Sequence, residues 1–283
     1  MNRTLNTLQL GIERGWMEFK LVLKDPQSIV WIVIMFGIFL TVLWFQRGTE
    51  INGISLALLT LPSLLGMQIA SSGFNDVASV LAADREDGTL FRAKATPRGM
   101  SAYFIARIVV ILLTSIVYLT IILIPSLLIV PGLSETISVG DFFTLAWLLM
   151  LGLLATAPFG AIIGSIVKSS GAGWGLTLLP LIVLTAISGI FYPITALAGW
   201  VQAIAQVFPV YWLGLGVRSA FNPEVAAAFE LTGSWRTAET VLVLLAWAIV
   251  GLLIVPKVLR KMARHTSGSE MQAARERMIQ RGY

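Results

Sequence analysis

Residues 101–130 read SAYFIARIVVILLTSIVYLTIILIPSLLIV, with Arg107 as the single charged side chain of the segment. A helix needs about 20 apolar residues to cross the hydrocarbon core of a bilayer. This segment is therefore long enough to span a membrane and predicts a transmembrane helix. It decides the fold class, because five other segments of the chain have the same character.

Together these segments predict an all-α polytopic membrane protein with six transmembrane helices. The predicted spans cover roughly residues 27–45, 54–81, 101–130, 141–167, 172–190 and 238–256. The composition agrees, since the 283 residues are 57% hydrophobic and 12% charged, whereas soluble domains carry about 25% charged residues.

The basic residues predict how the spans are oriented. With the N-terminus in the cytoplasm, 17 of the 20 Lys and Arg residues fall on the inner side and three on the outer side. Cytoplasmic loops of membrane proteins carry such an excess. We therefore expect a multi-pass protein of the cell membrane with both termini in the cytoplasm. Basic residues spread around apolar segments also argue against nucleic-acid binding, which needs a basic face.

The two ends of the chain have patterns of their own. Residues 1–26 carry an apolar stripe at three- and four-residue spacing, which predicts a helix lying in the inner membrane interface; the alternative is a helix folded onto the cytoplasmic ends of the spans. The stripe consists of Leu5, Leu8, Ile12, Trp16, Phe19 and Leu23. The tail, residues 257–283, is strongly basic and suits either a short helix near anionic headgroups or a solvated segment.

Residues 191–213, FYPITALAGWVQAIAQVFPVYWL, are apolar but are interrupted by Pro193 and Pro209. Proline breaks or kinks a helix, so no uninterrupted run long enough to cross the membrane lies between them. We predict a re-entrant hairpin of two short helices in the outer leaflet, which caps an exit or serves as a structural plug. No repeat or linker divides the chain, so residues 1–283 are interpreted as a single membrane domain.

Residues that carry enzyme chemistry are scarce. The chain has no cysteine and one histidine, His265, so neither a histidine–cysteine metal site nor a Ser–His catalytic pair can be assembled. No G-x-x-x-x-G-K-[ST] phosphate loop occurs, and that loop is the usual cradle for ATP. We therefore expect no catalytic residue, no metal and no cofactor in this chain.

A charged segment, ADREDGTLFRAKATP at residues 83–97, joins the second and third predicted spans. By itself it predicts a short polar helix, a helix–turn interrupted by glycine, or an ordinary solvated loop. Its D-R-E-D-G-T-L run and the following A-T-P resemble the E-R-E-x-G-T-L…T-P signature of ABC-2-type exporter permeases. A second segment, residues 188–220 with S-G-I-F-Y-P-I and F-P-V-Y-W, is similar to the other hallmark of that family.

Finer details resemble one branch, the daunorubicin-resistance-type permeases. Arg92, the A-T-P sequence and Arg107 agree with it. The positions that depart from the pattern of relatives are Phe91, Lys94 and Ala198.

The resemblance implies a permease that assembles as two copies with two separate ABC ATPase subunits, on which ATP and Mg²⁺ bind. It also implies that residues 83–97 form a coupling helix seated in a cleft of the ATPase. The residues expected to couple the chain to the ATPase are Asp84, Arg85, Glu86, Gly88, Thr89, Leu90, Phe91 and Arg92.

In such permeases the second and fifth spans face the cavity. The aromatic and thioether side chains of the first span in this chain are expected to add an apolar wall. The expected pathway residues are Trp31, Met35, Met67, Ser71, Phe74, Asn75, Thr177, Thr185 and Ser188; packing against lipid explains Trp31 and Met35 equally well. A mostly apolar cavity suits export of an amphipathic drug, antibiotic or lipid-like substrate. Sugar-polymer export also occurs in the superfamily.

Two other functions stay open. An ion-coupled secondary carrier needs acidic groups inside the membrane, and Asp76 is the one acid clearly within a predicted span; it is expected to reach the headgroups or to pair with Arg107. A non-transporting membrane anchor explains the helices but gives the charged segment and the hairpin no shared purpose.

Overall fold

The computed structural model describes the backbone of residues 3–51, 53–96, 98–167, 170–190, 193–221 and 224–265. These residues are almost entirely helical. The α-helices are α1 (Arg3–Lys24), α2 (Pro26–Gln46), α3 (Leu56–Ser71), α4 (Val77–Glu86), α5 (Thr89–Ala95), α6 (Gly99–Ile129), α7 (Leu133–Thr136), α8 (Val139–Ile166), α9 (Ser170–Ile187), α10 (Gly199–Val207), α11 (Pro209–Phe221) and α12 (Thr237–His265). The remaining elements are the π-helix η1 (Ser72–Asp76), the 3₁₀-helices η2 (Ile194–Ala196) and η3 (Glu224–Phe229), and the antiparallel strands β1 (Glu50–Ile51) and β2 (Ile54–Ser55).

The predicted fold class, an all-α polytopic membrane protein, is confirmed. Among the described residues, five helical segments are long and apolar enough to cross a membrane: Pro26–Gln46, Leu56–Arg85, Gly99–Ile129, Val139–Ile166 and Thr237–Val255. They match five of the six predicted spans. The fifth predicted span, 172–190, corresponds to α9, which has 18 residues and ends at Ile187, ahead of Gly189 in the left-handed region (φ +72°).

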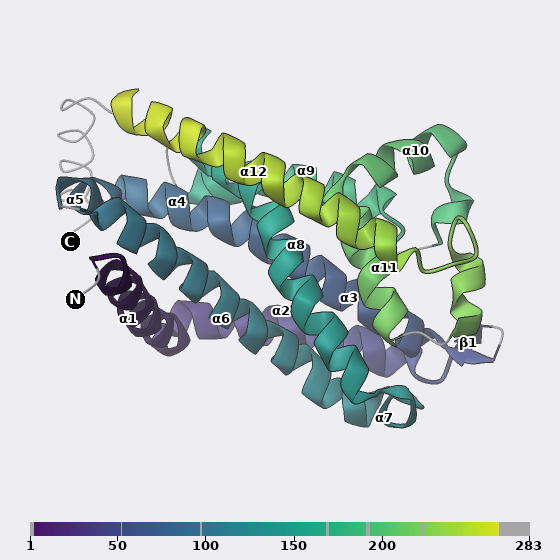
Figure 1. Cartoon of the computed structure of the whole chain (residues 1–283). Coiled ribbons are helices and arrows are strands. Elements are labelled where there is room, and N and C mark those ends of the chain that lie inside the picture. Colours follow the sequence, from purple (N-terminus) through teal and green to yellow (C-terminus); the bar gives the residue numbers. More distant parts are fainter. Residues whose placement is uncertain are drawn as a thin grey trace.

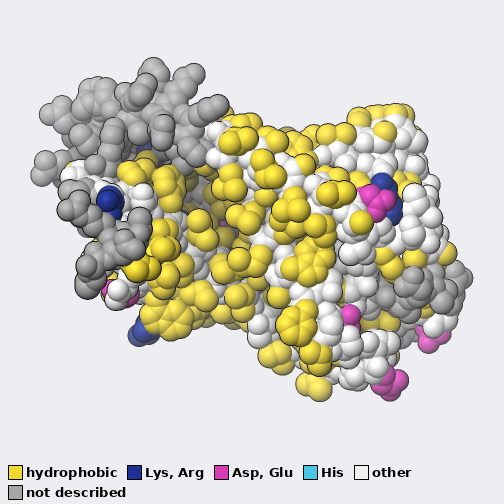
Figure 2. All heavy atoms as spheres, in the orientation of Figure 1, with side chains coloured by type: hydrophobic (Ala, Val, Ile, Leu, Met, Phe, Trp, Pro, Cys, Tyr) yellow, Lys and Arg dark blue, Asp and Glu magenta, His cyan; other side chains and the backbone are white. Residues whose placement is uncertain are grey.

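The spans form an elongated bundle (Figure 1). The start of α1, the short helix α5 and the end of α12 lie at one end of the bundle, and β1, α7 and α10 lie at the other. Hydrophobic side chains cover the middle of the face seen in Figure 2. The two described ends of the chain therefore lie on the same side of the apolar belt, as the predicted topology requires; that this side is cytoplasmic stays a prediction.

Helix α1 packs along the start of α6 through small residues rather than through its apolar stripe. A Cβ atom added at Gly11 would lie 2.7 Å from the Ile105 Cβ, and one added at Gly15 would lie 2.8 Å from the Ala106 carbonyl oxygen. Of the predicted stripe, Phe19 is buried, whereas the other five residues are exposed. Glycines allow the two backbones to approach closely, and they leave the apolar stripe facing outward, as suits an interfacial helix.

The centre of the bundle is closely packed around η1. Gly73 lies against Thr156 of α8, and Gly160 of α8 lies against the backbone carbonyls of Gly73 and Phe74. Gly164, one turn further along α8, touches the backbone of α4 at Ala78. None of the three glycines has room for a Cβ atom, so η1 and α4 lie closer to α8 than larger residues would allow.

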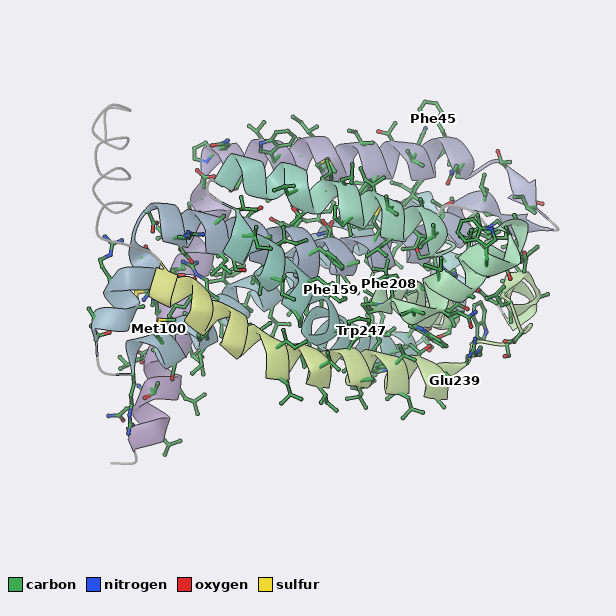
Figure 3. All side chains as sticks on the ribbon, turned by 90° about the horizontal axis from the view of Figure 1, so that it is seen from above. Phe45, Met100, Phe159, Phe208, Glu239 and Trp247 are labelled. Carbon is green, nitrogen blue, oxygen red and sulfur yellow. The ribbon has the colours of Figure 1, made fainter. Side chains whose placement is uncertain are left out.

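Aromatic side chains pack α12 against the rest of the bundle, as Figure 3 shows for Phe159, Phe208 and Trp247. The ring centroid of Trp247 lies 4.9 Å from that of Phe159 on α8 and 6.4 Å from that of Phe208, between α10 and α11. The Trp247 indole N–H also donates to the Val207 carbonyl oxygen at 2.8 Å. These contacts join α12 to α8 and to the bend between α10 and α11.

The apolar segment with two prolines forms the bent pair α10 and α11, whose axes meet at 90°. Proline is favoured in the first turn of a helix, where its missing N–H costs nothing, and Pro209 begins α11. The helix runs to Phe221, past the predicted hairpin end at residue 213. At its end Arg218 pairs with Glu230 at 2.6 Å, both almost fully buried. Residues 191–192 and 266–283, part of the predicted hairpin and tail, lie outside the described residues.

Candidate functional site

The charged segment after the second span forms a helix–turn–helix. Helix α4 continues that span and ends at Glu86; the turn is Asp87–Gly88, and α5 follows. Gly88 has φ +75°, a conformation that glycine adopts without the steric cost of a Cβ atom. The Thr89 amide, at the first residue of α5, donates to the Asp87 carboxylate at 2.8 Å across this turn. The predicted helix–turn interrupted by glycine is confirmed.

An ion-pair cluster joins this segment to two other helices. Asp84 is 4% exposed; it accepts a 2.5 Å hydrogen bond from the Tyr103 hydroxyl and pairs with the Arg107 guanidinium, both on α6. Arg107 also lies 2.9 Å from the carboxylate of Glu18 on α1, and Arg14 pairs with Glu18 at 2.7 Å. We call Arg14, Glu18, Asp84, Tyr103 and Arg107 the α1–α4–α6 cluster.

The cluster corrects the expected pair between Arg107 and Asp76. No ion pair between those two forms among the described side chains, because Asp84, eight residues nearer the end of the bundle, reaches Arg107 instead. Asp76 is half-buried and lies within hydrogen-bonding reach of the Ser72 hydroxyl.

Arg85 and Leu90 also make contacts within the chain. Arg85 donates to the carbonyl oxygens of Ser165 at 3.1 Å and Val167 at 3.4 Å, where α8 ends and leaves carbonyls without helical partners. Leu90 is buried in a small apolar core with Leu81 and Tyr103. These contacts hold α4 and α5 against α8 and α6.

Other residues of the helix–turn–helix are exposed or partly exposed. Arg92 is exposed and donates to the Thr89 hydroxyl at 3.0 Å. Asp87 and Thr96 are also exposed, and Gly88 and Thr89 are partly so. The side chains of Glu86 and Phe91, both predicted to contact the ATPase, lie outside the described part of the structure.

A groove of about 630 Å³, lined by both apolar and charged residues, runs between α1 and α5 and is closed by the start of α6. Its charged lining residues are three arginines, Arg14, Arg92 and Arg98, against one acid, Glu13. This groove is suited to an acidic or polar surface of another protein. The sequence predicted the helix α5 but not that α1 forms the opposite wall of this groove. The adjacent charges Glu13 and Arg14 on α1 were the sequence feature that could have indicated it.

The structure brings together some of the expected pathway residues. The Thr177 hydroxyl on α9 donates to the Asn75 side-chain oxygen on η1 at 2.5 Å. Met67, Ser71 and Asn75, four residues apart on the second span, are all half-buried. This spacing places them on one partly open helix face; Thr177, which contacts Asn75, is itself buried.

Other expected pathway residues lie elsewhere. Phe74 is buried, and its ring stacks on Phe159 with centroids 5.0 Å apart. The buried hydroxyls of Thr185 and Ser188 donate to backbone carbonyls of their own segment. Trp31 and Met35 are 55% and 44% exposed on α2. Within the described residues, no three His, Cys, Asp or Glu side chains gather as a metal site would need.

Comparison with known proteins adds one match. A family model described as ABC-2 type transporter matches residues 15–222, which run from α1 through α11 and include the helix–turn–helix. A search of curated proteins finds no match to the sequence.

Proposed function

Because the chain belongs to the ABC-2 type transporter family, we propose that it is the permease subunit of an ATP-driven exporter that works with a separate ATPase subunit. Members of this family are membrane transport components rather than catalytic domains. The proposal adds the direction, the substrate class and the assembly. In it, ATP and Mg²⁺ bind the partner ATPase, and two copies of this chain enclose the pathway in the cell membrane, with both termini in the cytoplasm.

One observation carries the proposal: a membrane span continues without a break into the helix–turn–helix at the end of the bundle. The buried Asp84 and the Arg85 bonds to the end of α8 hold this segment rigidly on the spans. A displacement of α5 must therefore move α4, α6 and α8, since packed elements transmit strain rather than absorb it. We propose that closure of two ATPase subunits upon ATP binding supplies that displacement.

The proposed pathway runs along the half-buried face of Met67, Ser71 and Asn75 and past Thr177. This face combines a thioether with hydroxyl and amide groups and has no charged residue among these four. Such a lining suits an amphipathic drug, antibiotic or lipid-like molecule, for which a few polar groups fix orientation within an apolar site.

A pathway along this face predicts the effect of filling it. We expect Ser71→Trp to lower ATP-driven efflux of an amphipathic dye from proteoliposomes about tenfold, because the added ring overpacks the proposed path. Binding of the ATPase should be unchanged. Leu128→Trp, at a residue 90% exposed on α6, is the matched control and should transport normally. Equal efflux from both variants would remove this face from the proposed pathway.

An ion-coupled carrier is the alternative that Asp76 supports, because an acid inside a span is costly unless it has a role. The two functions differ in their energy source. Uptake of dye into inverted vesicles that stops when ATP is withheld, and continues when the ion gradients are collapsed, supports the exporter; the reverse dependence supports the carrier.

The first experiment is a pull-down of the chain in mild detergent with its ATPase subunit. We expect Arg92→Glu to reduce retention of the ATPase about tenfold, since a charge reversal at an interface places like charges together. Lys20→Glu, the same reversal on the exposed face of α1, is the control and should retain the partner. A wild-type chain that is folded and retains no ATPase would contradict the proposed function itself.

A further inference from the structure

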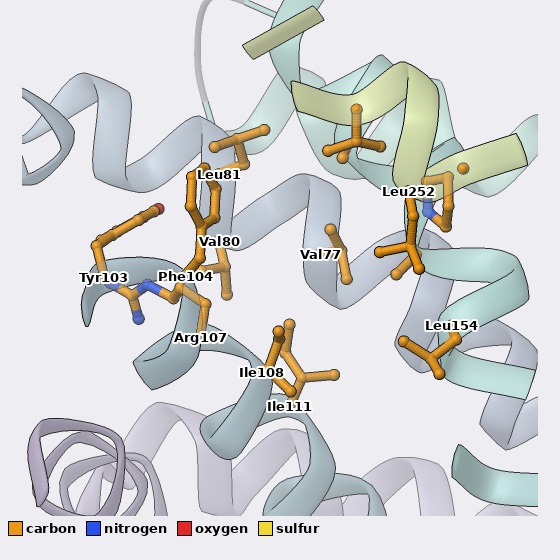
Figure 4. A pocket seen from close by; sticks show the side chains of 15 residues that line it. Val77, Val80, Leu81, Tyr103, Phe104, Arg107, Ile108, Ile111, Leu154 and Leu252 are labelled. Carbon is orange, nitrogen blue, oxygen red and sulfur yellow. The ribbon is translucent and has the colours of Figure 1, made fainter. Parts of the chain in front are cut away.

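A second cavity lies on the side of the bundle, away from the proposed pathway. It is a groove of about 300 Å³ between α6 and α12, with α4 and α8 forming its floor (Figure 4). Val77 and Val80 belong to the floor, and Ile108 and Leu252 belong to the two sides. We call this cavity the α6–α12 groove.

The lining of the α6–α12 groove is almost wholly hydrocarbon. Tyr103 and Arg107 are the polar side chains among its lining residues, and the rest are apolar or glycine. An apolar cavity of about 150 Å³ stays free of water and takes a benzene-sized ligand. A groove twice as large with the same chemistry has room for a longer hydrocarbon.

The groove lies in the half of the bundle that contains the α1–α4–α6 cluster. Along α6 its lining runs from Tyr103 to Ile111, a rise of about 12 Å for a helix. It begins four residues after the start of α6, so it spans roughly the inner half of a hydrocarbon core about 30 Å thick. This is the depth of the acyl chains of one leaflet.

The groove opens sideways, toward the space that lipid would occupy. At its rim Ile108 is 59% exposed, Leu252 is 61% exposed and Leu154 is 39% exposed. A protein helix is about 10 Å across and several turns long, which is too large for a 300 Å³ groove. A single hydrocarbon chain is small enough to enter a groove of this volume.

The groove has one end with polar side chains and one end that is wholly apolar. Figure 4 shows Tyr103 and Arg107 at one end, whereas Leu154 and Leu252 lie at the other. The Arg107 side chain is 19% exposed, and its guanidinium is held in place by the carboxylates of Asp84 and Glu18. The predicted inner side also carries 17 of the 20 basic residues, which attract anionic headgroups.

We propose that the α6–α12 groove is a binding site for one acyl chain of a phospholipid of the cytoplasmic leaflet, with its headgroup toward the Tyr103 end of the groove. The lipid fills the space between α6 and α12 and lies against Tyr103 and Arg107, the α6 part of the cluster. The site is separate from the proposed pathway and does not depend on the ATPase.

Photolabelling tests the site directly. The full chain is reconstituted in vesicles of phosphatidylcholine and phosphatidylglycerol that contain a phosphatidylglycerol with a diazirine on its acyl chain, and labelled residues are identified by mass spectrometry. We expect labelling of Val77 and Val80, which only a chain inserted between α6 and α12 can reach. The double variant Ile108→Trp/Leu252→Trp should lower this labelling about tenfold, because closing the rim removes contact with at least about two methylene groups.

The matched control is Ile116→Trp/Leu253→Trp, which places the same side chains at exposed positions of α6 and α12 outside the groove. It should label Val77 and Val80 as the unmodified chain does. Floor residues that are not labelled above background in the unmodified chain, or labelled equally in both double variants, would overturn the proposal. Because no ATPase is present, this result is independent of the proposed function.

Discussion

Proline at position 88 is expected to abolish coupled transport while leaving the spans inserted. Gly88 has φ +75°, whereas the proline ring fixes φ near −65°. The turn between α4 and α5 cannot form with proline, at a cost of roughly 3 kcal/mol or more, so α5 must leave its place on α6. We expect ATP-driven efflux to fall about a hundredfold, the rate equivalent of that energy, with ATP hydrolysis continuing without transport.

The control for Gly88→Pro compares two glycines with the same geometry. Gly53, between β1 and β2, has φ +78°, and neither Gly53 nor Gly88 has an atom within 4 Å of an added Cβ. Gly53→Ala and Gly88→Ala therefore carry the same strain, about 1–2 kcal/mol, at opposite ends of the bundle. Only Gly88→Ala, and not Gly53→Ala, should lower ATP-driven efflux. Normal efflux from a folded Gly88→Pro variant would rule out a coupling role for α5.

Removing the guanidinium of Arg107 is the second change with a large expected effect. Arg107→Met leaves the carboxylates of Asp84 and Glu18 close together without their shared cation. Breaking a buried ion pair by removing one partner costs about 3–5 kcal/mol. We expect a lower apparent unfolding temperature in detergent, and faster amide hydrogen exchange in α1, because Glu18 is the ionic link from α1 to α6.

Arg218→Met provides the comparison for this prediction. It breaks the buried pair with Glu230 and should lower the unfolding temperature similarly, but exchange in α1 should not change. If both variants leave α1 equally protected, the cluster does not hold α1, and the contacts of Gly11 and Gly15 suffice.

Sequence patterns predicted the elements better than their contacts. Five spans, the glycine turn at residue 88 and the bend before Pro209 follow from apolar length and from the backbone limits of glycine and proline, which are local properties. The packing face of α1 was not predicted, because apolar periodicity identifies an apolar face without saying whether protein or lipid covers it. Here glycines pack on α6 and the stripe faces outward.

Partners of charged residues were the hardest to predict. Asp76, inside the second predicted span, was an expected partner for Arg107, whereas Asp84, in the charged segment that follows, is the acid that meets it. Which one meets it depends on the rotation of each helix and on how α4 crosses α6, and neither is encoded in a single segment. For the same reason the sequence did not predict that Asp84 and Leu90 are buried, or that Arg85 donates to the carbonyl oxygens at the end of α8.

The π-helix at Ser72–Asp76 has a consequence for the register of the second span. A π-turn holds one residue more than an α-turn, and each residue of an α-helix advances by about 100°. Deleting one residue here would rotate α4 by about 100° relative to α3. Asp84 would turn away from Tyr103, and Arg85 would turn away from Val167. The extra residue of the π-turn thus fixes how far α4 is rotated about the helix axis relative to α3. The directions in which side chains point from the outer and inner halves of this span are therefore set independently.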